Sequence, residues 1–293
     1  MTPRTGSMLI LAASLLWGTT GTAQALAPPA ARPLAVASLR VVLGGALLLA
    51  VAARSRPRVE ASALGPILTA AASLVVAQLC FFTAVDRTGV AVGTIVAIGS
   101  SPIAAGGLEW VIGKRRPTRR WILATVVAVA GCVLLLVVGR SIDVDAAGVA
   151  LALVVGLGYA GYTLSTKRLV HDLPPDAATA VVFAAAAALM VPVLMRVDLA
   201  WVADPGGAVI VLHLGVVTVA LAYSLFARAL VAVPASTAVT LTLAEPLTAG
   251  LLGVAVLGER LSPPAVAGVI LVLSGLTVAT SGTRRDVTAA MHT

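Results

Sequence analysis

The stretch LTLAEPLTAGLLGVAVLGERL, residues 241–261, is apolar apart from a few positions in its first half and at its end. Glu245 and Pro246 stand side by side inside it. A proline within a helix removes one backbone hydrogen bond, and its ring clashes with the carbonyl four residues earlier, here that of Thr242. Because an ionisable residue in a lipid-length apolar run is costly, Glu245 is a candidate functional residue.

The composition of the whole chain indicates a membrane protein. Of its 293 residues, 59% are hydrophobic and 11% are charged, and the mean hydropathy is +1.05. A soluble protein has about a quarter of its residues charged, so much of this surface must contact lipid. The net charge of +8 comes from basic residues between apolar runs, which indicates orientation in a membrane. We therefore expect the lipid bilayer as a partner and no nucleic acid.

Ten apolar segments, separated by charged residues or prolines, are each long enough to cross a bilayer as a helix. They cover residues 8–26, 33–53, 63–85, 90–112, 120–138, 147–166, 175–196, 206–230, 233–257 and 262–281. Backbone in lipid must satisfy its own hydrogen bonds, and the sequence does not alternate as a barrel strand does. The predicted fold class is therefore an all-α integral membrane protein with ten transmembrane helices.

The distribution of basic residues predicts the orientation. The region after the fourth segment is strongly basic, with Lys114, Arg115, Arg116, Arg119 and Arg120. The corresponding loop of the second half, after residue 257, has Arg260 as its one basic residue. Since basic loops remain on the cytoplasmic side, we expect a multi-pass protein of the cytoplasmic membrane with both termini in the cytoplasm. Residues 286–293 would form a short cytoplasmic tail.

An internal repeat relates the two halves of the chain. TIVAIGSSPIAAGGLEWVIGKRRP (94–117) aligns with AVTLTLAEPLTAGLLGVAVLGERLS (238–262), and Pro102 falls on Pro246 at an offset of 144 residues. LAASLLWGTTG (11–21) likewise resembles LVVGLGYAGYT (153–163). Each half has an odd number of segments, so the second half must cross the membrane in the opposite sense. Residues 1–142 and 143–285 are therefore predicted to be inverted five-helix repeats, a plan of many secondary transporters.

Four stretches carry a resemblance to a known family. They are LLWGTTG in the first segment, ASLRVVLGG around Arg40, SSPIAAGGLEWVIGKR, and AEPLTAGLLGVAVLGERLSPPAVAGVILVLSG. Together they resemble the drug/metabolite transporter superfamily of the EamA type. The resemblance implies two five-helix halves, cytoplasmic termini, and export or exchange of small metabolites without ATP. The first half has Ser101 where the second has Glu245, which departs from any scheme that needs an acid in both halves.

Glu245 and Arg40 are predicted to handle the charge of a small-molecule substrate. Glu245 lies about 18 Å into its segment at the rise of an α-helix, near the middle of the membrane. It can bind a substrate amine, couple transport to protons, or make a structural hydrogen bond. Arg40 lies closer to the outer surface, where it can bind a carboxylate, pair with Glu245, or extend to the lipid headgroups.

Further candidates are polar or aromatic side chains within the segments. Aromatic residues that form a ligand surface or pack in the core are Trp17, Tyr159, Tyr162 and Tyr223. Residues that either contact ligand or join helices by hydrogen bonds are Gln78 and His213. Predicted helix breaks that line a cavity, each with a neighbouring hydroxyl, are Pro102 with Ser101 and Pro246 with Thr242.

The function predicted from these features is secondary transport. The sequence has no G-x-x-x-x-G-K-[ST] loop and no paired His or Cys cluster, so we expect no ATP-driven motor, cofactor or metal. A small polar or amphipathic metabolite would move outward by alternating access. Protons are the default coupling ion, and exchange or facilitated diffusion are the other modes left open. The alternatives are an integral membrane enzyme that acts on lipid-linked substrates, and a channel. The inverted repeat favours a transporter over both, so we expect that the protein is not an enzyme. The choice between monomer and homodimer stays open.

Overall fold

The computed structural model describes residues 1–53, 59–114, 116–136, 145–258 and 262–290, and within them every regular element is a helix. The α-helices are α1 (Pro3–Ala25), α2 (Pro33–Ala52), α3 (Leu64–Gly113), α4 (Arg119–Leu136), α5 (Ala146–Asp172), α6 (Pro175–Leu194), α7 (Pro205–Leu212), α8 (Ala222–Leu230), α9 (Ala235–Leu241), α10 (Glu245–Leu257) and α11 (Pro263–Ala290). Short 3-10 turns are η1 (Ala61–Ala63), η2 (Ala200–Ala203) and η4 (Thr242–Ala244), and η3 (His213–Leu221) is a π-helix. Arg115 and Arg260, which contributed to the predicted orientation, lie outside the described residues.

Eight helical stretches of the described chain are long and apolar enough to cross a membrane. They are Pro33–Ala52, Ala61–Val85, Val92–Ile112, Ala146–Asp172, Pro175–Leu194, Pro205–Leu230, Ala235–Val256 and Pro263–Thr280. Each overlaps a predicted segment, and the largest difference is at Ala146–Asp172, which continues six residues beyond the predicted end at residue 166. Helices α1 and α4 occupy the two other predicted segments but are not among these eight. The all-helical, multi-pass membrane fold is thus confirmed, while the count of ten stays a prediction.

Local sequence accounts for several helix ends. The hydroxyl of Thr2 caps α1 by accepting the backbone N–H of Thr5 at 3.2 Å. The carboxylate of Asp145 caps α5 by accepting the N–H of Gly148 at 2.6 Å. Such side-chain acceptors satisfy backbone donors that a helix leaves without internal partners. Helix α10 ends at Leu257, and the next residue, Gly258, has a φ of +71°, a conformation that glycine adopts without a steric penalty.

The two prolines aligned by the repeat have different local structures. Pro102 lies inside α3, which stays helical through it. At Pro246 the helix changes type instead, because α9 ends at Leu241, the 3-10 turn η4 follows, and α10 begins at Glu245. A membrane helix can continue past a proline because nearby hydroxyls and neighbouring helices compensate for the lost hydrogen bond. The interruption that the sequence predicts in both halves is therefore seen only at Pro246.

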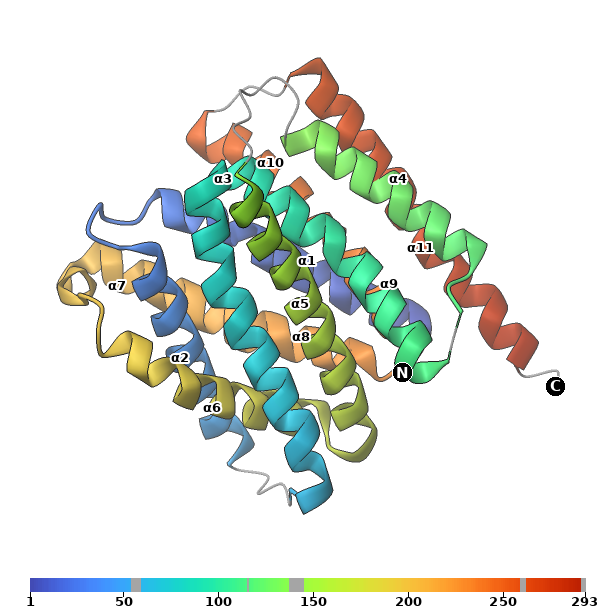
Figure 1. Cartoon of the computed structure of the whole chain (residues 1–293), viewed down its shortest axis with the longest axis horizontal. Helices are drawn as coiled ribbons and strands as arrows, with labels where there is room; N and C mark the ends of the chain where they lie inside the picture. The colour runs from blue at the N-terminus through green and yellow to red at the C-terminus, as the bar shows by residue number, and fades with distance from the viewer. Residues whose placement is uncertain (54–58, 115, 137–144, 259–261, 291–293) are drawn as a thin grey trace.

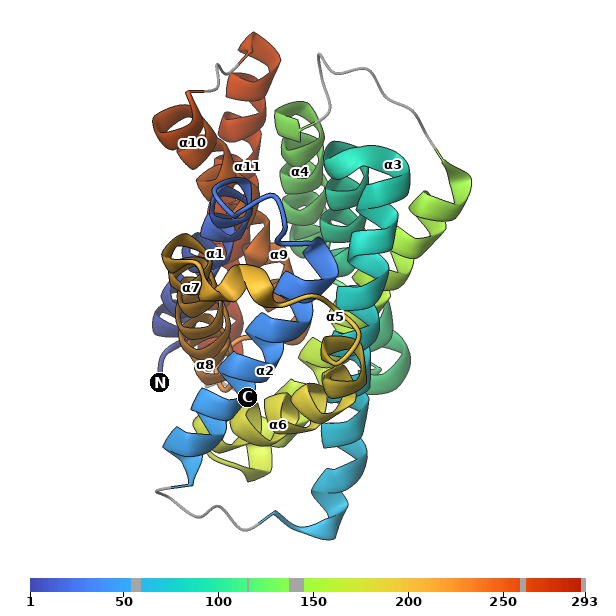
Figure 2. The ribbon, with the colours of Figure 1, turned by 90° about the vertical axis from the view of Figure 1, so that its left-hand side faces the viewer.

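Contacts between helices follow a two-fold pattern. Helix α2 packs against α6, and α4 packs against α11, so the second and the fifth segment of one half meet their counterparts in the other. The first segment of each half packs against the third and fourth segments of the other half. Helix α1 thus contacts α8 and α10, and α5 contacts α3. Helix α3 contains both the third and the fourth segment, which run in opposite directions (Figure 1). Figures 1 and 2 both show α4 and α11 side by side.

The interface between α4 and α11 shows the pattern at the level of single residues. A Cβ atom added to Gly131 would lie 2.6 Å from the backbone nitrogen of Val272 and 2.7 Å from the carbonyl oxygen of Gly268. A Cβ atom added to Gly275 would lie 2.7 Å from the carbonyl oxygen of Ala124 and 2.8 Å from the backbone nitrogen of Ala128. Residues 131, 124 and 128 correspond to 275, 268 and 272 at the offset of 144 that relates Pro102 to Pro246.

The helix bundle has two distinguishable ends. The start of α1, the end of α3 and the end of α11 lie at one end, which we call the terminal end (Figures 1 and 2). The end of α1, the start of α2 and the start of α11 lie at the opposite end, which we call the distal end.

Candidate functional site

A cavity of about 440 Å³ lies inside the bundle, between elements of both halves of the chain. Pockets for small molecules commonly have volumes of about 300–1,000 Å³, so the size fits a metabolite. The predicted site residues that line it are Trp17, Arg40, Gln78, Ser101, Tyr159, Tyr223, Thr242 and Glu245. They come from α1, α2, α3, α5, α8, η4 and α10. Residues far apart in the sequence therefore meet at one place.

The cavity extends from the middle of the bundle toward the distal end. Glu245 at the start of α10 and Trp17 in α1 line its inner part. Its lining continues to Gln24 near the end of α1 and to Pro33, which is exposed at the start of α2. The cavity is thus positioned to receive or release a small molecule at the distal end.

Arg40 faces the interior of the bundle. Its Nη2 atom donates a hydrogen bond of 3.3 Å to Oε1 of Gln78, across from α2 to α3. Its Nε atom is buried and has no hydrogen-bond partner among the described residues. A guanidinium group carries five N–H donors, so most of its hydrogen-bonding capacity remains for a ligand. This placement differs from an arginine that extends to the lipid headgroups.

Glu245 is the acidic residue of the described cavity lining. As the first residue of α10, it stands where the helix dipole favours a negative charge. Its backbone is fixed by the close approach of α1, because a Cβ atom at Gly18 would lie 2.8 Å from the Glu245 carbonyl oxygen and 2.4 Å from Cβ of Thr248. Among the described residues, no ion pair within 4.0 Å joins Glu245 to Arg40.

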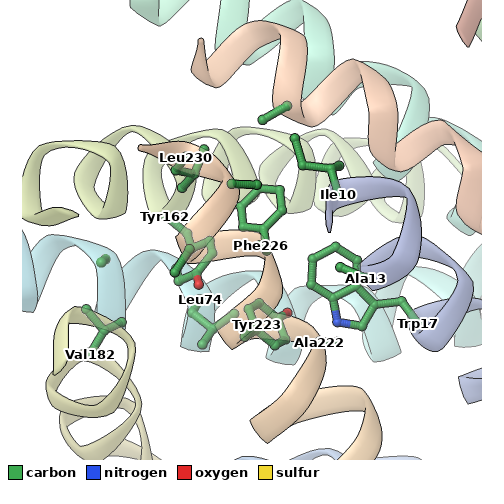
Figure 3. Packing of buried hydrophobic residues seen from close by; sticks show 14 of the residues in the cluster. Ile10, Ala13, Trp17, Leu74, Tyr162, Val182, Ala222, Tyr223, Phe226 and Leu230 are labelled. Atoms are coloured by element: carbon green, nitrogen blue, oxygen red, sulfur yellow. The ribbon is translucent and has the colours of Figure 1, made fainter. Parts of the chain in front are cut away.

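Aromatic side chains form one wall of the cavity and continue into the core behind it. The ring of Trp17 lies 4.8 Å from that of Tyr223 and 6.1 Å from that of Tyr159, measured between centroids. Figure 3 shows Trp17, Tyr223, Phe226 and Tyr162 converging from three helices. The indole Nε1 of Trp17 donates to the carbonyl of Thr218 at 2.9 Å, within the π-helix η3. π-Helical turns are frequent at functional sites.

Some predicted site residues lie outside the cavity lining. Tyr162 is fully buried, 5.5 Å from the ring of Tyr223, and packs on the aromatic wall from behind. His213 joins η3 to α1 through a contact of 2.8 Å between its Nε2 and the hydroxyl of Thr19. Pro102 and Pro246 are buried directly beside Ser101 and Glu245, which do line the cavity.

Other lining residues were not predicted from the sequence. Thr20 and Gln24 of α1 line the cavity together with Trp17. Positions 17, 20 and 24 share one face of a helix, because residues three and four apart are neighbours. A search along the helix face that carries Trp17 would therefore have found them. Phe81 of α3 lies three residues after Gln78, and Thr94 lies seven residues, about two helical turns, before Ser101, so the same search along these helix faces would have found them as well.

Polar contacts join the helices on the side of the terminal end. Nζ of Lys167 in α5 donates to the carbonyl of Leu230 and, at 3.0 Å, to that of Val233. A carboxylate oxygen of Glu109 in α3 accepts the backbone N–H of Ser236 at 3.2 Å. The connection between α8 and α9 is thus held from two other helices.

A bundle of helices of membrane-spanning length, with an internal cavity that holds one cationic and one anionic side chain, defines a multi-pass membrane transporter. The chain belongs to the EamA-like transporter family, whose sequence profile matches residues 4–137 and again residues 146–281.

Comparisons with individual proteins agree with this family. The chain is 47% identical over 284 residues to the Uncharacterized transporter YwfM of Bacillus subtilis (strain 168), with 97% of this chain and 96% of that protein covered. It is 32% identical over 263 residues to the Threonine/homoserine exporter RhtA of Escherichia coli (strain K12), with 87% and 84% covered. A crystal structure that is 20% identical in sequence superimposes with a TM-score of 0.81, covering 96% of this chain and 98% of that one, which shows a shared fold.

Proposed function

We propose that the protein is a secondary transporter that exports a small polar or amphipathic metabolite across the cytoplasmic membrane by alternating access. The observation that carries this proposal is the cavity that holds Arg40 and Glu245 between the two halves of the chain and extends toward the distal end. Sites at mid-membrane between repeats, reached from one side at a time, are typical of secondary transporters.

Two inverted five-helix repeats are part of the proposal. The two separate matches to the family profile support it, since their limits adjoin the predicted boundary between residues 142 and 143. The pairing of α2 with α6 and of α4 with α11 supports it as well. The counterpart contacts of Gly131 and Gly275 add residue-level support, because an unrelated pair of helices has no reason to repeat its contacts at one offset.

The orientation is also proposed, with the terminal end in the cytoplasm and the distal end outside. Lys114, Arg116, Arg119 and Arg120 follow the end of α3, at the terminal end, which agrees with the retention of basic loops on the cytoplasmic side. A cysteine introduced at Arg116 should react with a membrane-impermeant maleimide only in permeabilised cells. A cysteine at Arg32, beside the distal end of the cavity, should react in intact cells, and the reverse result would invert the topology.

Transport itself is tested with purified protein in liposomes. The relatives named threonine/homoserine exporters make small amino acids the first compounds to measure within a broader metabolite panel. We expect saturable uptake, counterflow between labelled and unlabelled substrate, and a response to an imposed pH gradient, all absent from empty liposomes. Conductance without saturation would indicate a channel. A panel in which no compound moves, with or without a gradient, would contradict the proposed function.

A further inference from the structure

We infer that the cavity selects a zwitterion, with the substrate carboxylate against Arg40 and the substrate ammonium group against Glu245. The inference rests on the proposed transport function and deepens it by naming the class of substrate and the residue that holds each pole.

The first step is that both charged groups remain available. Arg40 and Glu245 are the charged residues of the described cavity lining, and no ion pair within 4.0 Å joins them. The guanidinium group of Arg40 donates a hydrogen bond from Nη2 to Gln78, and its buried Nε atom has no hydrogen-bond partner among the described residues. Buried polar groups are normally hydrogen-bonded, and an unsatisfied one costs free energy. The arrangement therefore fits a ligand that supplies an acceptor to Arg40.

The second step concerns the charge of the ligand. A simple cation would neutralise Glu245 but leave Arg40 without a partner, and a simple anion would do the reverse. An uncompensated charge away from bulk water is strongly unfavourable. A ligand with both charges neutralises both poles at once, so the cavity discriminates against compounds that lack either one.

The third step concerns the rest of the ligand. The cavity has a volume of about 440 Å³, and its aromatic wall includes Trp17, Tyr159 and Tyr223. Aromatic faces stabilise ammonium groups and also contact apolar side chains. A zwitterion with a small or medium side chain therefore finds a surface for the part of the molecule that the charged residues do not hold.

Gln78 acts as a positioning residue in this arrangement. Its Oε1 accepts from Nη2 of Arg40 and so fixes the plane of the guanidinium group. A planar guanidinium recognises a carboxylate through parallel hydrogen bonds only when it is correctly oriented. Replacement by leucine should weaken recognition of the carboxylate without removing a charge.

The experiment measures transport of three matched compounds by the protein in liposomes. The compounds are homoserine, the amine that results from removing its carboxyl group, and the hydroxy acid that results from removing its amino group. We expect the wild-type protein to prefer homoserine over either analogue by about tenfold or more, because a site built for a polar group rejects a compound that lacks it.

The variants identify which pole each residue holds. Arg40→Gln should lose the preference for homoserine over the amine, and Glu245→Gln should lose the preference for homoserine over the hydroxy acid. Gln78→Leu should lower the preference over the amine while keeping the preference over the hydroxy acid. Matched controls are Arg32→Gln and Glu60→Gln, which remove the same charges from exposed positions outside the cavity lining. Arg40→Lys and Glu245→Asp, which keep each charge, show whether a loss reflects misfolding.

The possible results separate the two proposals. Equal transport of all three compounds by the wild-type protein, or an equal loss for all three in both neutral variants, would overturn the zwitterion site while the transport function stands. Transport of other metabolites from the panel but of no zwitterion would overturn it in the same way. A protein that moves nothing from the panel would contradict the proposed function, and the zwitterion site with it.

Discussion

Lys167 of α5 donates a hydrogen bond of 3.0 Å to the backbone carbonyl of Val233, in the turn that links α8 to α9. The same Nζ atom donates to the carbonyl of Leu230, the last residue of α8. Carbonyls at the end of a helix lack internal hydrogen-bond donors and carry partial negative charge. A lysine at this place supplies both a hydrogen-bond donor and a compensating positive charge. Under the proposed alternating access, this contact helps to close the cavity toward the terminal end.

The first prediction is that Lys167→Met loosens this closure. A hydrogen bond from a charged group contributes about 1.5–3 kcal/mol, so local opening of residues 230–236 should become roughly tenfold more frequent or more. Deuterium exchange of the backbone amides in this stretch measures the opening directly. Arg168→Met is the matched control, because it removes a positive charge from the adjacent, exposed position. Equal exchange in the two variants would show that Lys167 does not hold the turn.

How far the sequence alone reaches is clearest at Glu245. Glu245 stands alone in an apolar run, and because burying an ionisable side chain in a membrane is costly, the sequence alone marks it as a candidate functional residue. Arg40 and Gln78 are likewise polar groups within apolar segments, and Tyr223 is predicted as an aromatic that contacts ligand or packs in the core. The structure places all three in the lining of the same cavity. The all-helical membrane fold was predictable for a related reason, because length and hydropathy restrict what a chain in lipid can form.

What the sequence does not contain is the direction in which each side chain points. Tyr162 and Tyr159 are three residues apart and similar in kind, yet one is fully buried and the other lines the cavity. His213 is a polar residue within a segment like Gln78, yet it meets Thr19 away from the cavity. Pro102 and Pro246 share a register, yet only one coincides with a change of helix type. These outcomes depend on packing against other helices.

The second prediction concerns the pH dependence of transport. Glu245 shares the cavity lining with the titratable or charged groups Arg40, Tyr159 and Tyr223. Taking up a proton removes the negative charge of Glu245 and with it the attraction for a substrate ammonium group, so acidification should promote release. Glu245→Gln should therefore show residual transport with a flat pH profile and no response to a pH gradient. Glu60→Gln should retain the wild-type profile, and an unchanged profile in Glu245→Gln would place the titrating group elsewhere.

The third prediction separates the two roles of Trp17 in stability. Trp17→Phe keeps an aromatic ring against Tyr223 but removes the hydrogen bond to Thr218, and should lower the free energy of unfolding by about 0.5–1.5 kcal/mol. Trp17→Ala also removes the buried ring and should cost about 3–5 kcal/mol. Denaturant unfolding in detergent measures both values. The control pair is Trp110→Phe and Trp110→Ala, since Trp110 is 51% exposed, and comparable losses there would indicate a general effect of losing an indole.

The fourth prediction tests whether α4 and α11 meet as counterparts. Gly131→Ala and Gly275→Ala each place a Cβ atom within 2.8 Å of backbone atoms of the opposite helix, and backbone cannot move aside as a flexible side chain can. Each substitution should lower the free energy of unfolding by about 1–3 kcal/mol, as is typical of overpacking, and this loss should be measured as a lower apparent Tm. Gly107→Ala in α3 is the control, because an added Cβ there meets nothing within 4 Å and alanine favours a helix over glycine. A large loss in Gly131→Ala with none in Gly275→Ala would contradict a symmetric interface, because equivalent contacts must respond to the same added atom in the same way.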